Sequence, residues 1–141
     1  FKSVLKNMGK VKDFMNNTIA EARECGYTLT MFNRRRYLPD LKSDNRQVRE
    51  SAERIAINSP IQGSAADLIK VAMIRLSRSL KKIKLSSKMI LQIHDELLFE
   101  CPIHEKKETE SLVSKEMEGA CRLSVPLVVD MGWGKNWSEA H

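Results

Sequence analysis

The 141-residue sequence has few cysteines and no long apolar run. No stretch approaches the roughly 18 consecutive apolar residues of a membrane-spanning helix, so the sequence predicts no membrane partner. The first residues mix polar and apolar side chains and do not resemble a signal peptide. The three cysteines, Cys25, Cys101 and Cys121, fit neither a disulfide framework nor a zinc motif because they are odd in number and widely spaced. We therefore expect a globular protein of the cytoplasm.

The composition is that of one folded domain. Apolar residues make up 42% of the chain and charged residues 30%, which excludes a disordered tail or a low-complexity linker. Helical apolar spacing begins at Val4, and no initiator methionine precedes it. We therefore expect the chain to be a fragment of a larger protein.

The charge is unevenly distributed. Residues 1–88 hold 19 lysines and arginines against 8 carboxylates, a net charge of +11, whereas residues 89–141 carry −5. The densest basic block has no carboxylate between residues 70 and 88. Such a field favours a polyanion, with nucleic acid as the leading candidate, although a solvated helix face would have the same composition.

Apolar spacing predicts three helical regions. The first runs to Gly26, a C′ residue after Cys25. The second begins near Ser43 or Asp44 and breaks or kinks at 58–60, where Ser59 can cap a new helix with Pro60 in its first position. That new helix continues to Ile83. The third is an amphipathic helix over residues 104–121.

Two hairpins and one further strand complete the expected fold. Residues 27–31 and 34–38 alternate in β fashion around a turn, and residues 89–100 read as a second hairpin. Residues 126–131 read as a buried strand, followed by a loop over 132–137. The expected class is α+β, with long helices packed on one face of a small antiparallel sheet.

The run His94-Asp95-Glu96 lies between two apolar strands of the second hairpin. Carboxylates are poor strand residues, so these two are either turn residues that face water or ligands of a hard cation such as Mg²⁺. Strict alternation would place Asp95 on one face with Ile93 and Leu97, and Glu96 on the other face. On that geometry only one carboxylate can be the principal ligand.

Two features flank the Pro60 position. Arg54, Asn58 and Gln62 are spaced i, i+4, i+8 and share one face if the helix runs on through Pro60. Such hydrogen-bond donors suit the acceptors of the DNA minor groove, but the same spacing fits a plain polar surface. Residues 63–67 are mostly small, which favours close packing against another backbone. They lack the pattern of a phosphate-binding loop.

The chain resembles family A DNA polymerases, the bacterial DNA polymerase I type, over nearly its whole length. Four segments in the same order carry the resemblance. They are Arg34-Arg35-Arg36-Tyr37-Leu38-Pro39-Asp40, Ala52-Glu53-Arg54 through Asp67, Gln92 through Glu100, and Val125 through Val129 with Gly134-Lys135-Asn136-Trp137. The resemblance implies the C-terminal palm and the end of the fingers, with residues 1–26 as a fingers-side helix and 27–141 as fingers and palm.

The resemblance also implies the roles of site residues. Asp95 would hold the two catalytic Mg²⁺ ions, with Glu96 as a second, less central carboxylate of the catalytic metal site. His94 would lie by the primer terminus. The stripe Arg54, Asn58 and Gln62 would contact the template-primer duplex in the minor groove. The resemblance further implies a monomeric enzyme of the bacterial cytoplasm, at the nucleoid. Its implied partners are primer-template DNA and deoxynucleoside triphosphates.

Two parts of the family pattern are not found in these 141 residues. They are a second aspartate on an earlier palm strand and the helix that grips the incoming nucleotide. We therefore expect template-directed DNA synthesis from the parent enzyme and none from this fragment alone. A metal-dependent nuclease and a non-catalytic nucleic-acid-binding module stay open as alternatives.

Overall fold

The computed structural model describes the backbone of residues 2–140 and the side chains of residues 9–140. The chain divides into two compact units, Phe1–Asp67 and Leu68–His141. Val4, at which the helical apolar spacing begins, lies outside the described side chains. Within the described residues, no helix is both long enough and apolar enough to cross a bilayer.

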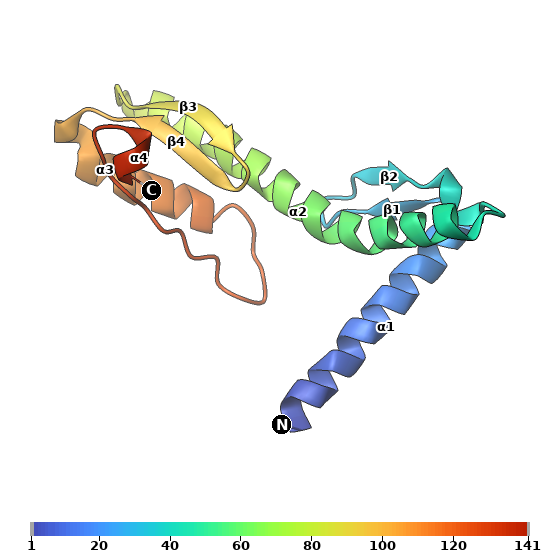
Figure 1. The fold of residues 1–141 in the computed structure, drawn as a ribbon. Coiled ribbons are helices and arrows are strands. Elements are labelled where there is room, and N and C mark those ends of the chain that lie inside the picture. The colour runs from blue at the N-terminus through green and yellow to red at the C-terminus, as the bar shows by residue number, and fades with distance from the viewer. Residues whose placement is uncertain (1, 141) are drawn as a thin grey trace. The chain divides into compact units, whose positions relative to one another are not determined.

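The first unit opens with helix α1 (Lys2–Cys25), followed by strands β1 (Tyr27–Leu29) and β2 (Arg35–Tyr37) and the short 3-10 helix η1 (Pro39–Lys42) (Figure 1). Gly26 ends α1 with a φ of +81°, and its N–H donates to the carbonyl of Ala22 at 2.9 Å. This left-handed position suits glycine, as the sequence predicted. The first predicted hairpin is also confirmed, with antiparallel pairing of β1 and β2.

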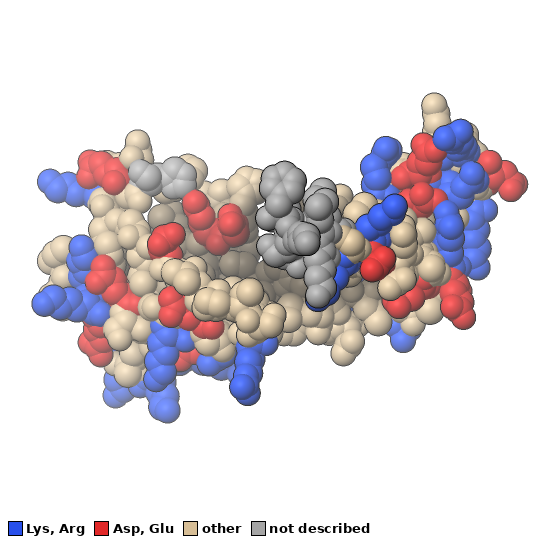
Figure 2. Space-filling view, turned by 90° about the horizontal axis from the view of Figure 1, so that it is seen from below, with Lys and Arg blue, Asp and Glu red and all other residues tan. Residues whose placement is uncertain are grey.

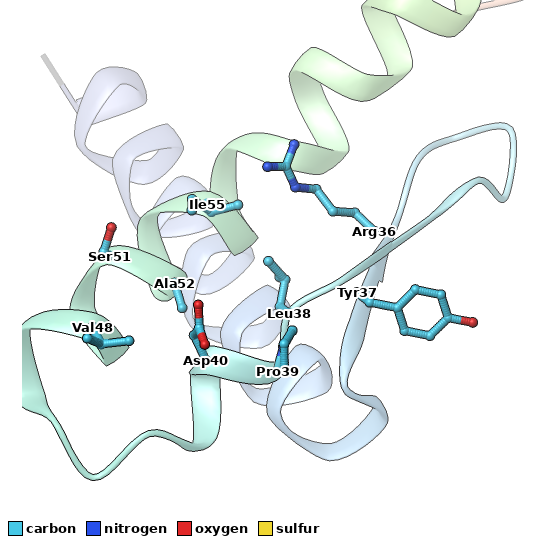
Figure 3. A pocket seen from close by; sticks show the side chains of 9 residues that line it. All are labelled: Arg36, Tyr37, Leu38, Pro39, Asp40, Val48, Ser51, Ala52 and Ile55. Carbon is cyan, nitrogen blue, oxygen red and sulfur yellow. The ribbon is translucent and has the colours of Figure 1, made fainter.

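The core of the first unit is small and made largely of small side chains. Its buried members come from α1, the η1 region and the first half of helix α2 (Arg46–Ile83): Ala22, Leu38, Leu41, Ala52 and Ala56. Alanines at these positions let the helices approach closely. A hollow of about 350 Å³ lies beside this core. Figure 3 shows the side chains that line it, most of which come from β2, η1 and α2.

Helix α2 runs through Pro60 without a break, so of the two expectations at 58–60, a break or a kink, the break is wrong. Ser59 does not cap a new helix. Its hydroxyl donates to the carbonyl of Ile55 at 2.6 Å, and the residue is buried. Tertiary packing on both sides of Pro60 thus outweighs the local preference of proline. The start of α2 is capped by Asn45, whose Oδ1 accepts from the N–H of Gln47 at 2.9 Å, rather than by Ser43 or Asp44.

The second unit contains strands β3 (Lys88–Ile93) and β4 (Glu96–Glu100), the 3-10 helix η2 (Ile103–Glu105), helix α3 (Lys106–Glu118) and the short helix α4 (Trp137–Ala140). The second predicted hairpin and the third predicted helix are confirmed. The buried apolar residues of this unit lie on one face of α2 and on α3: Ile69, Ala72, Leu76, Leu80 and Val113. An ion pair between Arg75 and Glu116 links α2 to α3 at 3.0 Å.

The α+β class is confirmed, but the strands differ from the expected single sheet. The described residues form two separate two-stranded antiparallel sheets, β1–β2 and β3–β4. Residues 126–131 form no strand, and Val128 is 75% exposed, so the predicted buried strand is wrong. A strand needs a neighbouring backbone for its hydrogen bonds, and none of the described residues pairs with this segment.

Candidate nucleic-acid interface and catalytic hairpin

The His94-Asp95 pair forms the two-residue turn of the β3–β4 hairpin. Ile93 and Glu96 are paired across the turn, and His94 has a φ of +52°. Histidine is among the few residues enriched at left-handed positions, so it can close this turn. The side-chain amide of Gln92 donates to the carbonyl of His94 at 3.0 Å and braces the turn. His94, Asp95 and Glu96 are all exposed.

This turn corrects the expected alternation of side chains. Because Ile93 and Glu96 lie directly opposite each other, they share one face of the sheet, and Leu97 pairs with Gln92 instead. Asp95 therefore does not share a strand face with Ile93 and Leu97. The argument that only one of Asp95 and Glu96 can be the principal ligand depended on that alternation, so this geometry no longer chooses between them.

The hairpin tip offers carboxylate oxygens of the kind that Mg²⁺ prefers. Two carboxylates in adjacent positions match the donor type of a divalent cation site. However, the described residues contain no group of three or more His, Cys, Asp or Glu side chains that could enclose an ion. Asp95 and Glu96 therefore fit part of a ligand set.

The unbroken α2 helix places Arg54, Asn58 and Gln62 along one side. All three are exposed, and their i, i+4, i+8 spacing runs along a continuous helix through Pro60. The sequence predicted a shared face if the helix continued through Pro60, and the helix does continue. The stripe presents a guanidinium and two amides to solvent, which can donate hydrogen bonds to a ligand.

A buried carboxylate, Asp67, anchors the β1–β2 hairpin to α2. Its oxygens accept from the hydroxyl of Thr30 at 2.7 Å and from Nε of Arg34 at 2.8 Å. Asp67 is only 8% exposed. The expectation of close packing at residues 63–67 is correct, but sequence reasoning missed these three residues as a unit. The sequence signal that could have revealed them is Asp67, a charged residue at the end of a run of small side chains over residues 63–66.

A second buried carboxylate, Glu105, tethers the start of α3. It accepts from the N–H of Ser86 and of Ser87, both at 2.9 Å, and from the Ser87 hydroxyl at 2.7 Å. The hydroxyl bond from Ser87 and the backbone bond from Ser86 lower the pKa of Glu105 from 4.5 to about 2. This residue stabilises the unit that carries the β3–β4 hairpin.

The basic block of residues 70–88 lies on α2, on the segment that follows it and at the start of β3. Most of its members are exposed, but Arg75 is paired with Glu116 and its guanidinium also donates to the carbonyl of Gly119. Figure 2 shows acidic side chains beside basic ones in this view. The block is therefore partly compensated by α3, which weakens but does not remove its attraction for a polyanion.

Comparison with known proteins places these features in one family. A model described as DNA polymerase family A matches residues 1–139. The DNA polymerase I of Mycobacterium leprae is 54% identical over 132 residues, and that of Caldicellulosiruptor bescii is 55% identical over 130 residues. These matches cover 94% and 92% of this chain, and 14% and 15% of the relatives.

A solved structure with a similar fold is the POL domain of Pol1 from M. smegmatis in complex with DNA primer-template and dNTP. The TM-score is 0.92 with 53% sequence identity, and the match covers 94% of this chain and 23% of that one. The chain thus spans about one seventh of the length of the DNA polymerase I relatives it matches. The match of nearly every residue to the family model confirms the resemblance of its motifs, and the chain belongs to DNA polymerase family A.

Proposed function

We propose that this chain is the C-terminal part of a DNA-directed DNA polymerase. The enzyme joins the 3′-oxygen of a primer to the α-phosphorus of a deoxynucleoside triphosphate and releases pyrophosphate. The observation that carries the proposal is the likeness to a polymerase domain solved with primer-template and dNTP, at 53% identity over 94% of this chain. That likeness favours a polymerase over a nuclease or a non-catalytic binding module.

In this proposal Asp95 and Glu96 belong to the catalytic metal site. Their position at the exposed tip of a hairpin supports this role, because both carboxylates are accessible and Gln92 donates a hydrogen bond to the carbonyl of His94 in the turn. These two carboxylates would help to hold two Mg²⁺ ions, which would lower the pKa of the primer hydroxyl and neutralise the charge of the triphosphate. The remaining ligands would come from outside these 141 residues. His94, which closes the same turn, would lie near the primer terminus.

The stripe of Arg54, Asn58 and Gln62 would hold the template-primer duplex. Purine N3 and pyrimidine O2 present acceptors in the minor groove at every base pair, so donors aimed there sense pairing geometry without reading sequence. The exposure of all three side chains along one continuous helix supports this role.

The proposal also covers the parts and setting of the enzyme. Residues 1–26 would belong to the fingers and 27–141 to fingers and palm of a monomeric polymerase. The relatives reported above are bacterial, which supports a bacterial enzyme. Its proposed place of action is the cytoplasm, at the nucleoid.

A primer-extension assay on the longer protein that carries this chain tests the proposal. With Mg²⁺ and each of four template bases, we expect addition of the complementary deoxynucleotide alone. The 141-residue chain by itself should add none. Shortening of the primer in place of extension would indicate a nuclease, and binding without either reaction would indicate a non-catalytic module.

A further inference from the structure

We propose that Thr30, Arg34 and Asp67, here called the clamp, position Gln62 against the primer-template duplex. The inference rests on the minor-groove role proposed above for Gln62. It assigns a positioning function to three residues that do not themselves belong to the stripe. All of them lie in the first unit, on the β1–β2 hairpin and on α2.

The helix turn that carries Gln62 lies unusually close to the hairpin. Gly63 directly follows Gln62, and a Cβ placed on Gly63 would lie 2.6 Å from Cγ2 of Thr30. Real Cβ atoms do not come that close to another carbon. Glycine is therefore needed here so that α2 can contact the hairpin turn.

Hydrogen bonds fix this contact over the helix turn that follows Gln62. Nη2 of Arg34 donates to the carbonyl of Gly63 at 3.3 Å, while Nε of the same guanidinium donates to Asp67. The hydroxyl of Thr30 donates to the other oxygen of Asp67 and accepts from the N–H of Arg34 at 3.1 Å. The N–H of Met31 donates to Oγ of Ser64 at 2.8 Å. One arginine thus holds the helix one and five residues beyond Gln62.

The helix needs such support because Pro60 lies inside it. Proline has no N–H, so the carbonyl of Ala56 receives no helical hydrogen bond from it, and its ring crowds the preceding turn. Asn58 comes before Pro60 in this weakened turn of the helix, and Gln62 comes after it. Without the clamp, the direction of Gln62 relative to Asn58 would depend on a helix that lacks one of its own bonds.

Two of the three clamp residues are buried, which separates them from direct contact with DNA. Asp67 is buried and negatively charged, so it offers nothing to a phosphate. Thr30 is buried as well. Arg34 is half-exposed, with 51% of its side chain accessible, so its variant is judged against those of the two buried partners.

The test is single-turnover extension by the full-length polymerase from matched and mismatched primer ends. The variants are Arg34→Lys, Asp67→Asn and Thr30→Val, each alone and combined with Gln62→Ala. We expect Gln62→Ala to slow matched extension about fivefold, the size of one lost hydrogen bond. Arg34→Lys and Asp67→Asn should lose a similar factor and narrow the ratio of matched to mismatched extension. Thr30→Val, which keeps the ion pair, should lose less.

The combined variants decide whether the clamp acts through Gln62. We expect Arg34→Lys or Asp67→Asn to add less than about twofold once Gln62 is alanine, because coupled residues are non-additive. Arg46→Lys is the matched control, since Arg46 pairs with Glu50 in an exposed contact on the same helix. It should extend like the wild type. If Asp67→Asn unfolds, as judged by thermal unfolding, Arg34→Lys and Thr30→Val carry the test.

Different failures have different meanings. Clamp variants that extend like the wild type, or factors that multiply in the double variants, overturn the clamp alone. Wild-type extension by Gln62→Ala overturns the minor-groove role and with it the clamp. No template-directed extension by the unsubstituted protein overturns the proposed function itself.

Discussion

Glu105 accepts three hydrogen bonds from residues 86 and 87, and these bonds hold its pKa near 2. Because the folded pKa lies below the ordinary value of 4.5, the ionised carboxylate stabilises the fold above about pH 4.5. That contribution is lost as the pH falls from about 4.5 toward 2. We expect Glu105→Gln to lower the stability at neutral pH and to flatten its dependence on pH in this acid range.

Urea unfolding midpoints at pH 7, 4.5 and 2.5 check this prediction. Glu108→Gln is the matched control, because Glu108 is exposed on the same helix, α3. It should follow the wild type throughout. Equal acid dependence in Glu105→Gln and the wild type would show that these hydrogen bonds do not stabilise the carboxylate.

Gln62 offers a test of the proposed minor-groove contact. We expect Gln62→Ala in the intact enzyme to slow extension from a paired primer. The activation free energy should rise by about 1 kcal/mol, the contribution of the lost hydrogen bond. The loss should be similar for all four terminal base pairs, because the groove acceptors are shared. Primer extension with four matched termini measures this.

The control for Gln62 is Gln47→Ala, the same substitution at another exposed position of α2. It should leave extension unchanged. A loss confined to one terminal base pair would mean direct sequence readout, in conflict with a sensor of geometry.

At the scale of elements, the contact between α2 and the β1–β2 hairpin decides whether Gly63→Ala raises or lowers the stability of the fold. Gly63→Ala gains about 1 kcal/mol of helix propensity. The new Cβ would lie 2.6 Å from Cγ2 of Thr30, and such overpacking costs about 1–3 kcal/mol. We therefore expect a net loss of stability in Gly63→Ala, measured by thermal unfolding.

A second variant isolates the cause of that loss. Thr30→Ser keeps the hydroxyl that bonds Asp67 but removes Cγ2. In this background Gly63→Ala should become neutral or stabilising, since the nearest remaining contacts of the new Cβ, the Arg34 guanidinium at 3.3 Å and Cβ of residue 30 at 3.9 Å, are far less severe. An unchanged loss in the Thr30→Ser background would refute the close contact.

The elements also show where local sequence patterns suffice. Gly26, the two hairpins and the third helix were predictable because each depends on neighbouring residues. The passage of α2 through Pro60 was not, because it depends on burial of Ala56 and Ser59 against distant parts of the chain. The strand expected at 126–131 failed for a related reason, since an apolar run becomes a strand only beside a partner.

The candidate site divides in the same way. The stripe was predictable in residue type and spacing, and His94-Asp95-Glu96 stood out as polar residues between apolar strands. The turn geometry at Asp95 was missed because alternation was carried through a position where the chain reverses. The clamp joins Thr30 to Asp67 across 37 residues of sequence, a contact that no local pattern encodes.

On the scale of the whole molecule, the uneven charge predicts how the chain meets DNA. Residues 1–88 carry a net charge of +11. We expect the 141-residue chain to bind duplex DNA weakly, with an affinity that falls steeply as salt rises and counterions are released. Fluorescence anisotropy with labelled duplex at increasing salt measures the slope, and residues 89–141 alone, with −5, provide the control. Binding that does not depend on salt would contradict the electrostatic account.

The central claim is that Asp95, at the tip of the β3–β4 hairpin, is the principal protein ligand of the metal site of nucleotidyl transfer. Asp95→Asn keeps the shape of the side chain but removes its charge, so the chemical step should collapse while duplex binding is largely retained. Because the family resemblance makes Glu96 the less central carboxylate, Glu96→Gln should lose much less, and His94→Ala should chiefly disturb the primer end.

The most direct measurement is single-turnover incorporation by these three variants of the full-length enzyme at saturating Mg²⁺, with duplex affinity measured in parallel. The account predicts a drop of several orders of magnitude in rate for Asp95→Asn alone. A near wild-type rate for Asp95→Asn, or a larger loss for Glu96→Gln than for Asp95→Asn, would contradict it.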